Sequence, residues 1–226
     1  MAPDAGFAAE LRGFGPAGIV AVIVILLTGN VFVGNMIAVP VGAALVLGWR
    51  SLSRTPWREL GLARPDNWTR TVAGGLLFGV AFAFLLKAVV KPLLGFDPVN
   101  QPYHFLVGNT AMLPTAVWDM FVAGFGEELL FRGYLFERLG RLCGSSPHAR
   151  LAIVLITSAG FGLDHYANQG LPGVGQGVIF GLVFGTIAMA ARRIWPLMIA
   201  HTAFDLTALA IIYWDLETTV AHLFFK

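Results

Sequence analysis

Ionisable side chains interrupt three otherwise apolar stretches of the chain. They are Glu127, Glu128 and Arg132 in the first stretch, Asp164 and His165 in the second, and His201 and Asp205 in the third. A carboxylate in a low-dielectric site suits a general base that activates water, and a histidine beside it can hold that water or donate to an oxyanion. Two histidines with one or two carboxylates also meet the ligand requirement of a catalytic zinc site. These residue types indicate hydrolysis and leave the need for a metal open.

Spacing assigns different surroundings to neighbouring residues. Glu128 and Arg132 are four apart, so on a helix they share one face and are expected to form an ion pair. Glu127 is rotated by about 100° from Glu128 and remains free for a partner on another helix. His201 and Asp205 are again four apart and present an imidazole and a carboxyl on one stripe.

The composition predicts a membrane protein. Of 226 residues, 57% are hydrophobic and only 12% are charged, and the mean hydropathy is +0.73. This is more apolar surface than a globule of this size can bury. A net charge of +2 without a concentrated basic stretch argues against nucleic acid as a partner. The single cysteine, Cys143, excludes an intramolecular disulfide.

The hydrophobic pattern predicts an all-α, polytopic transmembrane bundle of about seven spans. The apolar run over 17–49 would be roughly 50 Å long as one helix, against a hydrocarbon core of about 30 Å, so two short spans hinged at Thr28-Gly29-Asn30 fit better. The other expected spans are 71–90, 114–139, 151–165, 174–191 and 195–214. We treat the segment 166–173 as an outer loop.

Arginine positions predict the orientation. Alternating spans bring three clusters to one face: Arg50, Arg54, Arg58, Arg64 and Arg70; Arg138, Arg141 and Arg150; Arg192 and Arg193. Because Lys and Arg are retained on the cytoplasmic side, this face is expected to be cytoplasmic. We therefore predict a multi-pass protein of the plasma (inner) membrane, with an active site reached from the cytoplasm.

The charged residues must avoid lipid, because one charge near the bilayer centre costs roughly 2.5 to 3.5 kcal/mol on insertion scales. We expect those of the three stretches to face one another inside the bundle, except Asp164, which we expect to be solvated at the outer interface. Gly124 and Gly126 beside the glutamates would let another helix or a substrate backbone approach closely.

The three polar groups form a recognisable series of motifs. EExxxR begins at Glu127, FxxxH runs from Phe161 to His165, and HxxxD runs from His201 to Asp205. Their order and helical placement resemble the CAAX protease and bacteriocin-processing family of intramembrane endopeptidases, over about residues 57–214. The chain is thus expected to be one integral-membrane, protease-like domain over 1–226, with the motif-bearing core at about 57–214.

The resemblance implies hydrolysis of a peptide bond in a membrane-associated or lipidated (CAAX-type) protein or a leader peptide. By position, Glu127 looks like the base and His165 helps to place the water. His201 and Asp205 look like the oxyanion-stabilising pair, with Glu128 and Arg132 in support.

The last position differs from the prenyl-protein endoproteases of this family. They have Asn there, whereas Asp205 donates a hydrogen bond only when protonated. Metal ligation therefore stays open for this chain. The ligands of a divalent metal such as Zn²⁺ would be Glu127, His165, His201 and Asp205.

Two other functional classes compete with proteolysis. In a transporter or proton-coupled permease, the same buried Glu and His residues would relay protons or bind ions. A non-catalytic relative would keep the site and only bind a peptide. No HExxH occurs, and Ser145 and Ser146 lie outside a GxSG context, so zinc proteases of the HExxH type and serine proteases are disfavoured.

Overall fold

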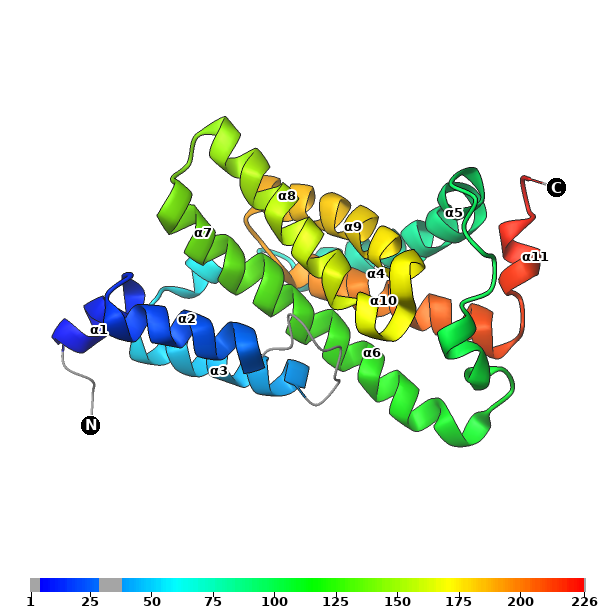
Figure 1. The fold of residues 1–226 in the computed structure, drawn as a ribbon, viewed down its shortest axis with the longest axis horizontal. Coiled ribbons are helices and arrows are strands. Elements are labelled where there is room, and N and C mark those ends of the chain that lie inside the picture. Colours follow the sequence, from blue (N-terminus) through cyan, green and yellow to red (C-terminus); the bar gives the residue numbers. More distant parts are fainter. Residues whose placement is uncertain (1–4, 29–37, 226) are drawn as a thin grey trace.

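The computed structural model describes residues 5–28 and 38–225, which form an all-helical fold without a strand (Figure 1). The α-helices are α1 (Ala5–Arg12), α2 (Pro16–Thr28), α3 (Ala38–Leu52), α4 (Trp68–Leu85), α5 (Lys91–Leu93), α6 (Leu113–Glu128), α7 (Phe136–Cys143), α8 (Pro147–Asp164), α9 (Tyr166–Ala191), α10 (Trp195–Tyr213) and α11 (Glu217–Ala221). Three short 3₁₀ helices lie in the connections: η1 (Trp57–Leu60), η3 (Gln101–Leu106) and η4 (Thr110–Met112). Two π-helical turns are η2 (Leu86–Val90) and η5 (Leu129–Leu135).

The described residues contain three or four candidate membrane spans, and the seven that we expected are not shown. Three helical stretches are long and apolar enough to cross a membrane: Trp68–Leu93, Tyr166–Ala191 and Trp195–Tyr213. A fourth span results if α1 and α2, bent by 53°, are counted together. Helix α3 has 15 residues, fewer than the about 20 that a span usually needs. The all-α, multi-helix prediction is confirmed, but seven spans are not shown.

Helix boundaries follow local signals that the sequence carries. The Asn67 side chain accepts a hydrogen bond from the Arg70 N–H and starts α4, and the Ser146 side chain does the same for the Ala149 N–H at α8. Proline occupies the first turn of α6, α8 and α10, where it has no helical hydrogen bond to lose. The predicted hinge at residues 28–30 lies largely outside the described residues.

Two long helices depart from the expected pattern. Helix α6 continues through the π-turn η5 into α7, which places the EExxxR motif at a change of helical register. Helix α9 begins at Tyr166, so the expected outer loop at 166–173 is wrong: this stretch is helical, with a kink at Gly170 (φ 61°, ψ −157°). Glycine accepts this backbone conformation without the steric cost of a Cβ.

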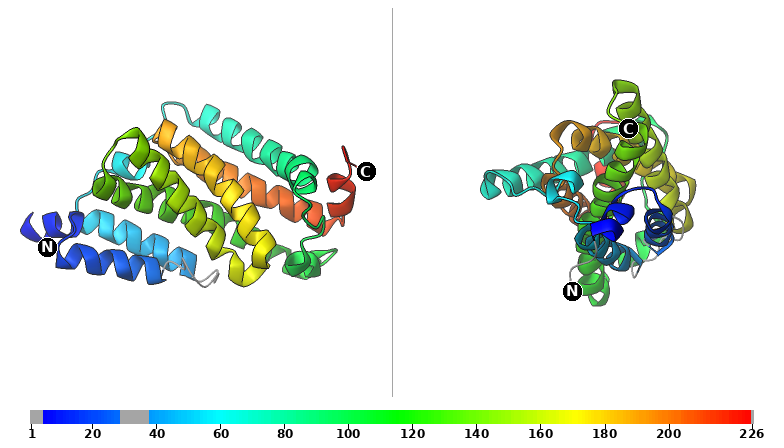
Figure 2. Two further views of the ribbon diagram at one scale, coloured as in Figure 1. Left: turned by 45° about the horizontal axis from the view of Figure 1, so that its top comes forward. Right: turned by 90° about the vertical axis from the view of Figure 1, so that its left-hand side faces the viewer.

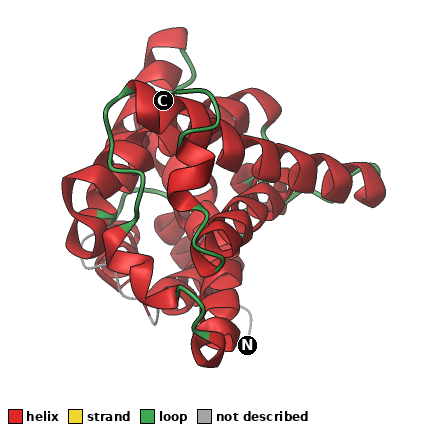
Figure 3. Cartoon of the chain, turned by 90° about the vertical axis from the view of Figure 1, so that its right-hand side faces the viewer, coloured by secondary structure: helices red, strands yellow, loops and turns green. Residues whose placement is uncertain are grey.

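Helix α10 forms the centre of the bundle. It packs against α4 and α6, while α8 packs along α9. In the left view of Figure 2, α4 lies on one side of this group, and α2 with α3 lies on the other. Figure 3 looks onto the end of the molecule where the connections around η3 and α11 gather. Buried phenylalanines fill the centre, with the rings of Phe82 and Phe204 5.6 Å apart and those of Phe180 and Phe204 5.1 Å apart.

Gly79 lies at the closest approach of α4 to α10 among the glycines of α4. A Cβ on Gly79 would lie 2.1 Å from the Ala200 carbonyl oxygen and 2.8 Å from the Ala203 Cβ. By contrast, a Cβ on Gly74, in the same helix, would meet nothing within 4 Å. The two helices therefore owe their contact to the missing side chain at Gly79.

We predict that Gly79→Ala lowers the stability of the protein and that Gly74→Ala does not. The added methyl must push α10 away, at a cost of about 1–3 kcal/mol. At Gly74 the higher helix propensity of alanine contributes roughly 0.5–1 kcal/mol in the opposite direction. Thermal unfolding of both variants in detergent measures the difference, and equal melting temperatures would contradict the close contact.

Candidate active site

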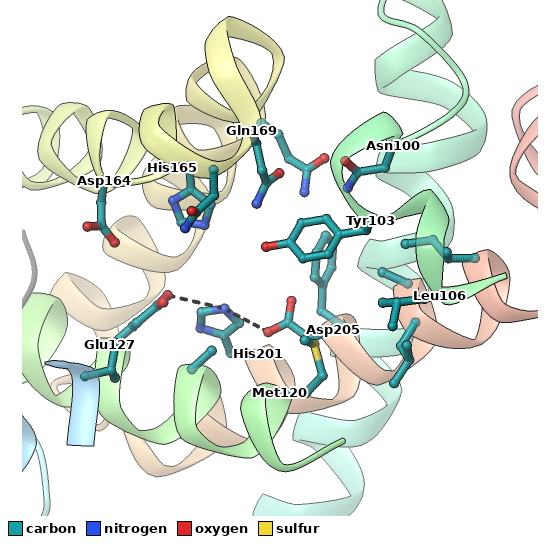
Figure 4. Close-up of a pocket in the computed structure, with 18 residues that line it drawn as sticks. Asn100, Tyr103, Leu106, Met120, Glu127, Asp164, His165, Gln169, His201 and Asp205 are labelled. Atoms are coloured by element: carbon teal, nitrogen blue, oxygen red, sulfur yellow. Dashed lines mark ion pairs between the residues drawn. The ribbon is translucent and has the colours of Figure 1, made fainter. Parts of the chain in front are cut away.

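A cavity of about 130 Å³ lies between α6, the α8–α9 corner, α10 and the connection that carries η3 (Figure 4). Four predicted site residues line it: Glu127, His165, His201 and Asp205. The structure thus brings together residues from all three motifs. Glu128 and Arg132 do not line this cavity and lie behind it, in contact with His201.

The two adjacent glutamates have different environments. Glu128 has no exposed surface and accepts hydrogen bonds on one oxygen, Oε1, from Arg132 Nη1 at 2.9 Å and from His201 Nδ1 at 3.0 Å. The expected i,i+4 ion pair is therefore confirmed. Glu127 faces the cavity instead, and its Oε2 has no hydrogen-bond partner in the described part of the chain. Glu128 is engaged in holding its neighbours, whereas Glu127 is available.

His201 connects this network to the cavity. Because its Nδ1 donates to a carboxylate, its Nε2 is the atom directed to the cavity side. Nε2 lies 3.4 Å from Asp205 Oδ2 and 3.9 Å from Glu127 Oε2. The predicted stripe of His201 and Asp205 on one face of α10 is thus present. An imidazole held from behind by Glu128 faces two carboxylates in front.

His165 lies on the other side of the cavity from Glu127 and His201 (Figure 4). Its Nδ1 is 2.8 Å from the Phe161 carbonyl oxygen, which can only accept. Nδ1 must therefore carry the proton, and in the neutral ring Nε2 is left with a lone pair. The spacing of the FxxxH motif thus fixes the tautomer of the histidine within one helical turn.

Aromatic rings form the apolar wall of the site. The Phe180 ring centroid lies 4.5 Å from that of His201, and the Phe161 centroid lies 4.8 Å from that of His165. The Arg132 guanidinium carbon sits 4.4 Å from the Phe161 ring centroid. The charged network is therefore enclosed by aromatic rings, which keep lipid and bulk water from it and strengthen its electrostatic interactions.

Glycines allow the helices to come this close. A Cβ on Gly124 would lie 2.1 Å from Thr202 Oγ1, and one on Gly126 would lie 2.4 Å from Val39 Cγ1. In both cases the neighbour is another helix of the chain, α10 or α3. Of the two uses that we expected for these glycines, helix packing is the one observed.

Asp164 corrects an expectation. It is only 6% exposed and lines the cavity, so it is not solvated at the outer interface. The turn from α8 into α9 folds back over the bundle, and this carries Asp164 inward with His165. Its Oδ1 has no hydrogen-bond partner among the described residues.

The connection between α5 and α6 supplies residues that sequence reasoning missed. Tyr103, Asn100 and Leu106 line the cavity, and Figure 4 shows the Tyr103 hydroxyl directed into the space between His165 and Asp205. Burial, followed by the negative charges of Asp205 and Glu127, raises the pKa of the Tyr103 phenol. Tyr103 is far from every motif along the chain, and no local sequence pattern marks it.

A buried acid holds this connection in place. The Asn100 N–H lies 3.1 and 3.2 Å from the two carboxylate oxygens of Glu217, which is only 1% exposed. The Lys87 ammonium binds both Glu217 and the Pro98 carbonyl oxygen. Three separate segments, the π-turn η2 that follows α4, the η3 connection and α11, are thus joined at one carboxylate, which sets the position of Tyr103.

The arrangement does not fit a metal ion. In residues 5–28 and 38–225, no group of three or more His, Cys, Asp or Glu side chains could hold one. The expected zinc set of Glu127, His165, His201 and Asp205 therefore shares a cavity without forming a coordination site, and no step below uses a metal.

Comparison with known proteins identifies the motif-bearing segment. Residues 109–207 match the family model described as type II CAAX prenyl endopeptidase Rce1-like. The match includes all three motifs and confirms the resemblance that they indicated, over a shorter stretch than 57–214. No curated protein and no solved structure matches the chain.

We predict that Arg132→Gln is far more destabilising than Arg193→Gln. Both arginines make an ion pair at 2.9 Å, but the side chains of Arg132 and Glu128 are 1% and 0% exposed, and those of Arg193 and Asp66 are 40% and 83% exposed. Removing one partner of a buried pair costs about 3–5 kcal/mol, because the other charge is left without compensation. An exposed pair contributes about 0–1 kcal/mol.

Thermal unfolding in the same detergent compares the two variants. Similar losses for Arg132→Gln and Arg193→Gln would show that the buried Glu128–Arg132 pair does not stabilise α6 and η5 as described.

Proposed function

We propose that the chain, whose residues 109–207 match the family model of Rce1-like type II CAAX prenyl endopeptidases, is a protease that hydrolyses a peptide bond at the cavity lined by Glu127, His165, His201 and Asp205. The substrate is a membrane-associated or lipidated (CAAX-type) protein or a leader peptide. The observation that carries the proposal is that the two adjacent glutamates, Glu127 and Glu128, differ in their hydrogen bonding. One is bound by Arg132 and His201, and the other has a free oxygen at the cavity.

Glu127 acts as the general base. Its carboxylate takes a proton from a water in the cavity, and the resulting hydroxide attacks the carbonyl carbon of the substrate peptide. The same proton then passes to the leaving amine, so that the carboxylate is regenerated. His165 supports this step, because its unprotonated Nε2 can accept a hydrogen bond from the water while Nδ1 is fixed by Phe161.

The developing oxyanion needs hydrogen-bond donors, and an ionised Asp205 cannot supply one. Tyr103 is suited to this role because its hydroxyl points into the cavity beside Asp205. Its raised pKa keeps the phenol protonated, and therefore a donor, across the neutral pH range. Asp205 then positions His201, whose Nε2 lies 3.4 Å from Oδ2. In this proposal the Tyr103 hydroxyl donates the hydrogen bond that the side-chain amide of an Asn at position 205 would donate.

The position of the cavity argues against access from the cytoplasm. Its lining on α10 runs from His201 towards Tyr213, away from the end of the helix that follows Arg192 and Arg193. The η3 connection and the α8–α9 corner close the same end. We propose that the arginine-rich face is cytoplasmic, as the sequence predicts, and that substrates reach the site from the opposite half of the membrane, contrary to our sequence-based expectation.

We predict that Glu127→Gln lowers cleavage by at least about 100-fold, as expected for loss of a general base. The assay incubates the purified protein in detergent with a library of membrane-protein, leader and prenylated CAAX peptides and identifies new termini by mass spectrometry. Asp119→Asn is the matched control, because Asp119 is on the same helix but does not line the cavity. A parallel incubation with chelator is expected to leave cleavage unchanged.

Three results would contradict the proposal. Full cleavage by Glu127→Gln would exclude its role as base. Proton-coupled flux in proteoliposomes without cleavage would favour the transporter alternative. Peptide binding by the wild type without any new terminus would favour a non-catalytic relative.

We further predict that Tyr103→Phe lowers kcat by about 100-fold with little change in KM, because a donor to the transition state is lost and the ring is kept. Tyr166→Phe is the control, since Tyr166 is 58% exposed and does not line the cavity. Adding Asp205→Asn to Tyr103→Phe should restore part of the activity, because an amide donates where a carboxylate does not. Two observations together would mean that Tyr103 only shapes the cavity. They are a rise in KM as large as the expected fall in kcat, and no recovery of activity when Asp205→Asn is added.

A further inference from the structure

A second and larger cavity, of about 530 Å³, opens at the other end of the bundle. It lies between η1, α7, the start of α8 and the end of α9, and the right view of Figure 2 looks onto this end of the molecule. No residue lines both this cavity and the catalytic one. Arg132 forms part of its inner wall, so the Glu128–Arg132 pair stands between the two cavities. The proposed peptidase chemistry makes no use of it.

The lining of this cavity carries more positive than negative side chains. It consists of five arginines and two glutamates: Arg58, Arg132, Arg141, Arg150, Arg192, Glu59 and Glu137. Arg132 is neutralised by Glu128 from behind. Positive charge therefore dominates the remaining surface.

Both glutamates are already occupied by arginines. Glu59 binds Arg12 and Arg141, each at 2.6 Å. Glu137 binds Arg141 and Arg138, with Arg138 Nη2 at 2.8 Å. Burial opposes the charge on Glu59, but the hydrogen bonds and positive charges of Arg12 and Arg141 outweigh it and lower the pKa of Glu59. Neither carboxylate is left to neutralise the other arginines.

Three arginines at this cavity have no acidic partner. In the part of the chain that the structure describes, no carboxylate forms an ion pair with Arg58, Arg150 or Arg192. They come from three different elements, η1, α8 and the end of α9, and line one cavity. Guanidinium groups present several N–H donors in a planar fork that matches the oxygens of a phosphate.

Apart from Ser145, the rest of the wall is apolar. Phe136, Ile153 and Ile194 line the cavity beside the arginines. Nearby along the chain, Leu142 and Leu151 are 66% and 59% exposed, as expected where a helix end meets lipid. A site with cations and apolar side chains together suits a ligand with the same two parts, such as the headgroup of an anionic phospholipid and the first carbons of its chains.

We propose that the cavity lined by Arg58, Arg150 and Arg192 is a binding site for a phosphate group, supplied by an anionic phospholipid of the arginine-rich face or by a free phosphate compound. The proposal is independent of the peptidase assignment, because it concerns other residues and is tested by binding alone.

The test measures binding to the purified protein in neutral detergent by native mass spectrometry. Phosphatidic acid, phosphatidylcholine and inorganic phosphate are titrated separately, at an ionic strength near 0.15 M so that weak surface interactions are screened. The cavity variant carries Arg58→Gln with Arg150→Gln. The matched control carries Arg64→Gln with Arg70→Gln, which removes two exposed arginines from the same predicted face outside the cavity.

We expect phosphatidic acid to bind more tightly than phosphatidylcholine. The cavity variant should weaken this binding by at least about tenfold, through loss of charge-assisted hydrogen bonds, and the control by less than about twofold. Displacement of the lipid by inorganic phosphate would identify a free phosphate as a sufficient ligand, whereas binding of the lipid alone would identify the lipid as the source.

Two results would overturn the proposal. Equal weakening in both double variants would mean that only the general positive charge of this face attracts anions. Binding of neither phosphatidic acid nor inorganic phosphate to the folded wild type would mean that the cavity has no phosphate site. Circular dichroism of each variant ensures that only folded protein is compared.

Discussion

The hydrogen-bonded group of Arg132, Glu128 and His201 is the interaction on which the rest of the site depends. Three charged or polarisable side chains, all 5% exposed or less, meet on one carboxylate oxygen in an aromatic enclosure. None of them can be removed without leaving another polar group buried and unpaired, which is the costly case in a low-dielectric interior. The group joins α10 to α6 and its π-helical continuation, and it turns the reactive edge of His201 towards Glu127 and Asp205. The π-turn η5 belongs to this arrangement, since such turns are frequent at functional sites.

The η3 connection, which covers the cavity, is held in place by a second buried carboxylate, that of Glu217. Glu217 joins η2, α11 and the η3 connection, so that a segment without a long helix has a defined position over the site. One buried acid thus organises the helices that bear the motifs, and another organises the connection that covers them. The two devices explain how a mostly apolar bundle maintains a polar cavity: each charge inside it is either paired or directed into the cavity.

The two ends of the molecule carry different cavities. The cavity lined by Glu127, His165, His201 and Asp205 lies towards the end where η3 and the α8–α9 corner gather, and the arginine-lined cavity lies at the opposite end. Between them stand the Glu128–Arg132 pair and the close contact of α6 with α10 at Gly124. At position 205 the chain has Asp where the prenyl-protein endoprotease motif has Asn. The Asp205 carboxylate cannot donate a hydrogen bond when it is ionised, but the Tyr103 phenol, which can, lies beside it.

The sequence by itself determined the helical class, the membrane character, the three motifs and the i,i+4 pairs, because these depend on composition and on the 3.6-residue period. It also separated Glu127 from Glu128, since adjacent residues on a helix point in different directions. Tertiary structure decided what depends on contacts between distant segments. Tyr103 entered the site through a clamp at Glu217, more than a hundred residues away in the chain. Asp164 became buried because the corner after α8 folds inward. The end of the bundle at which the cavity lies likewise follows from how helices of unequal length pack together, which local sequence patterns do not specify.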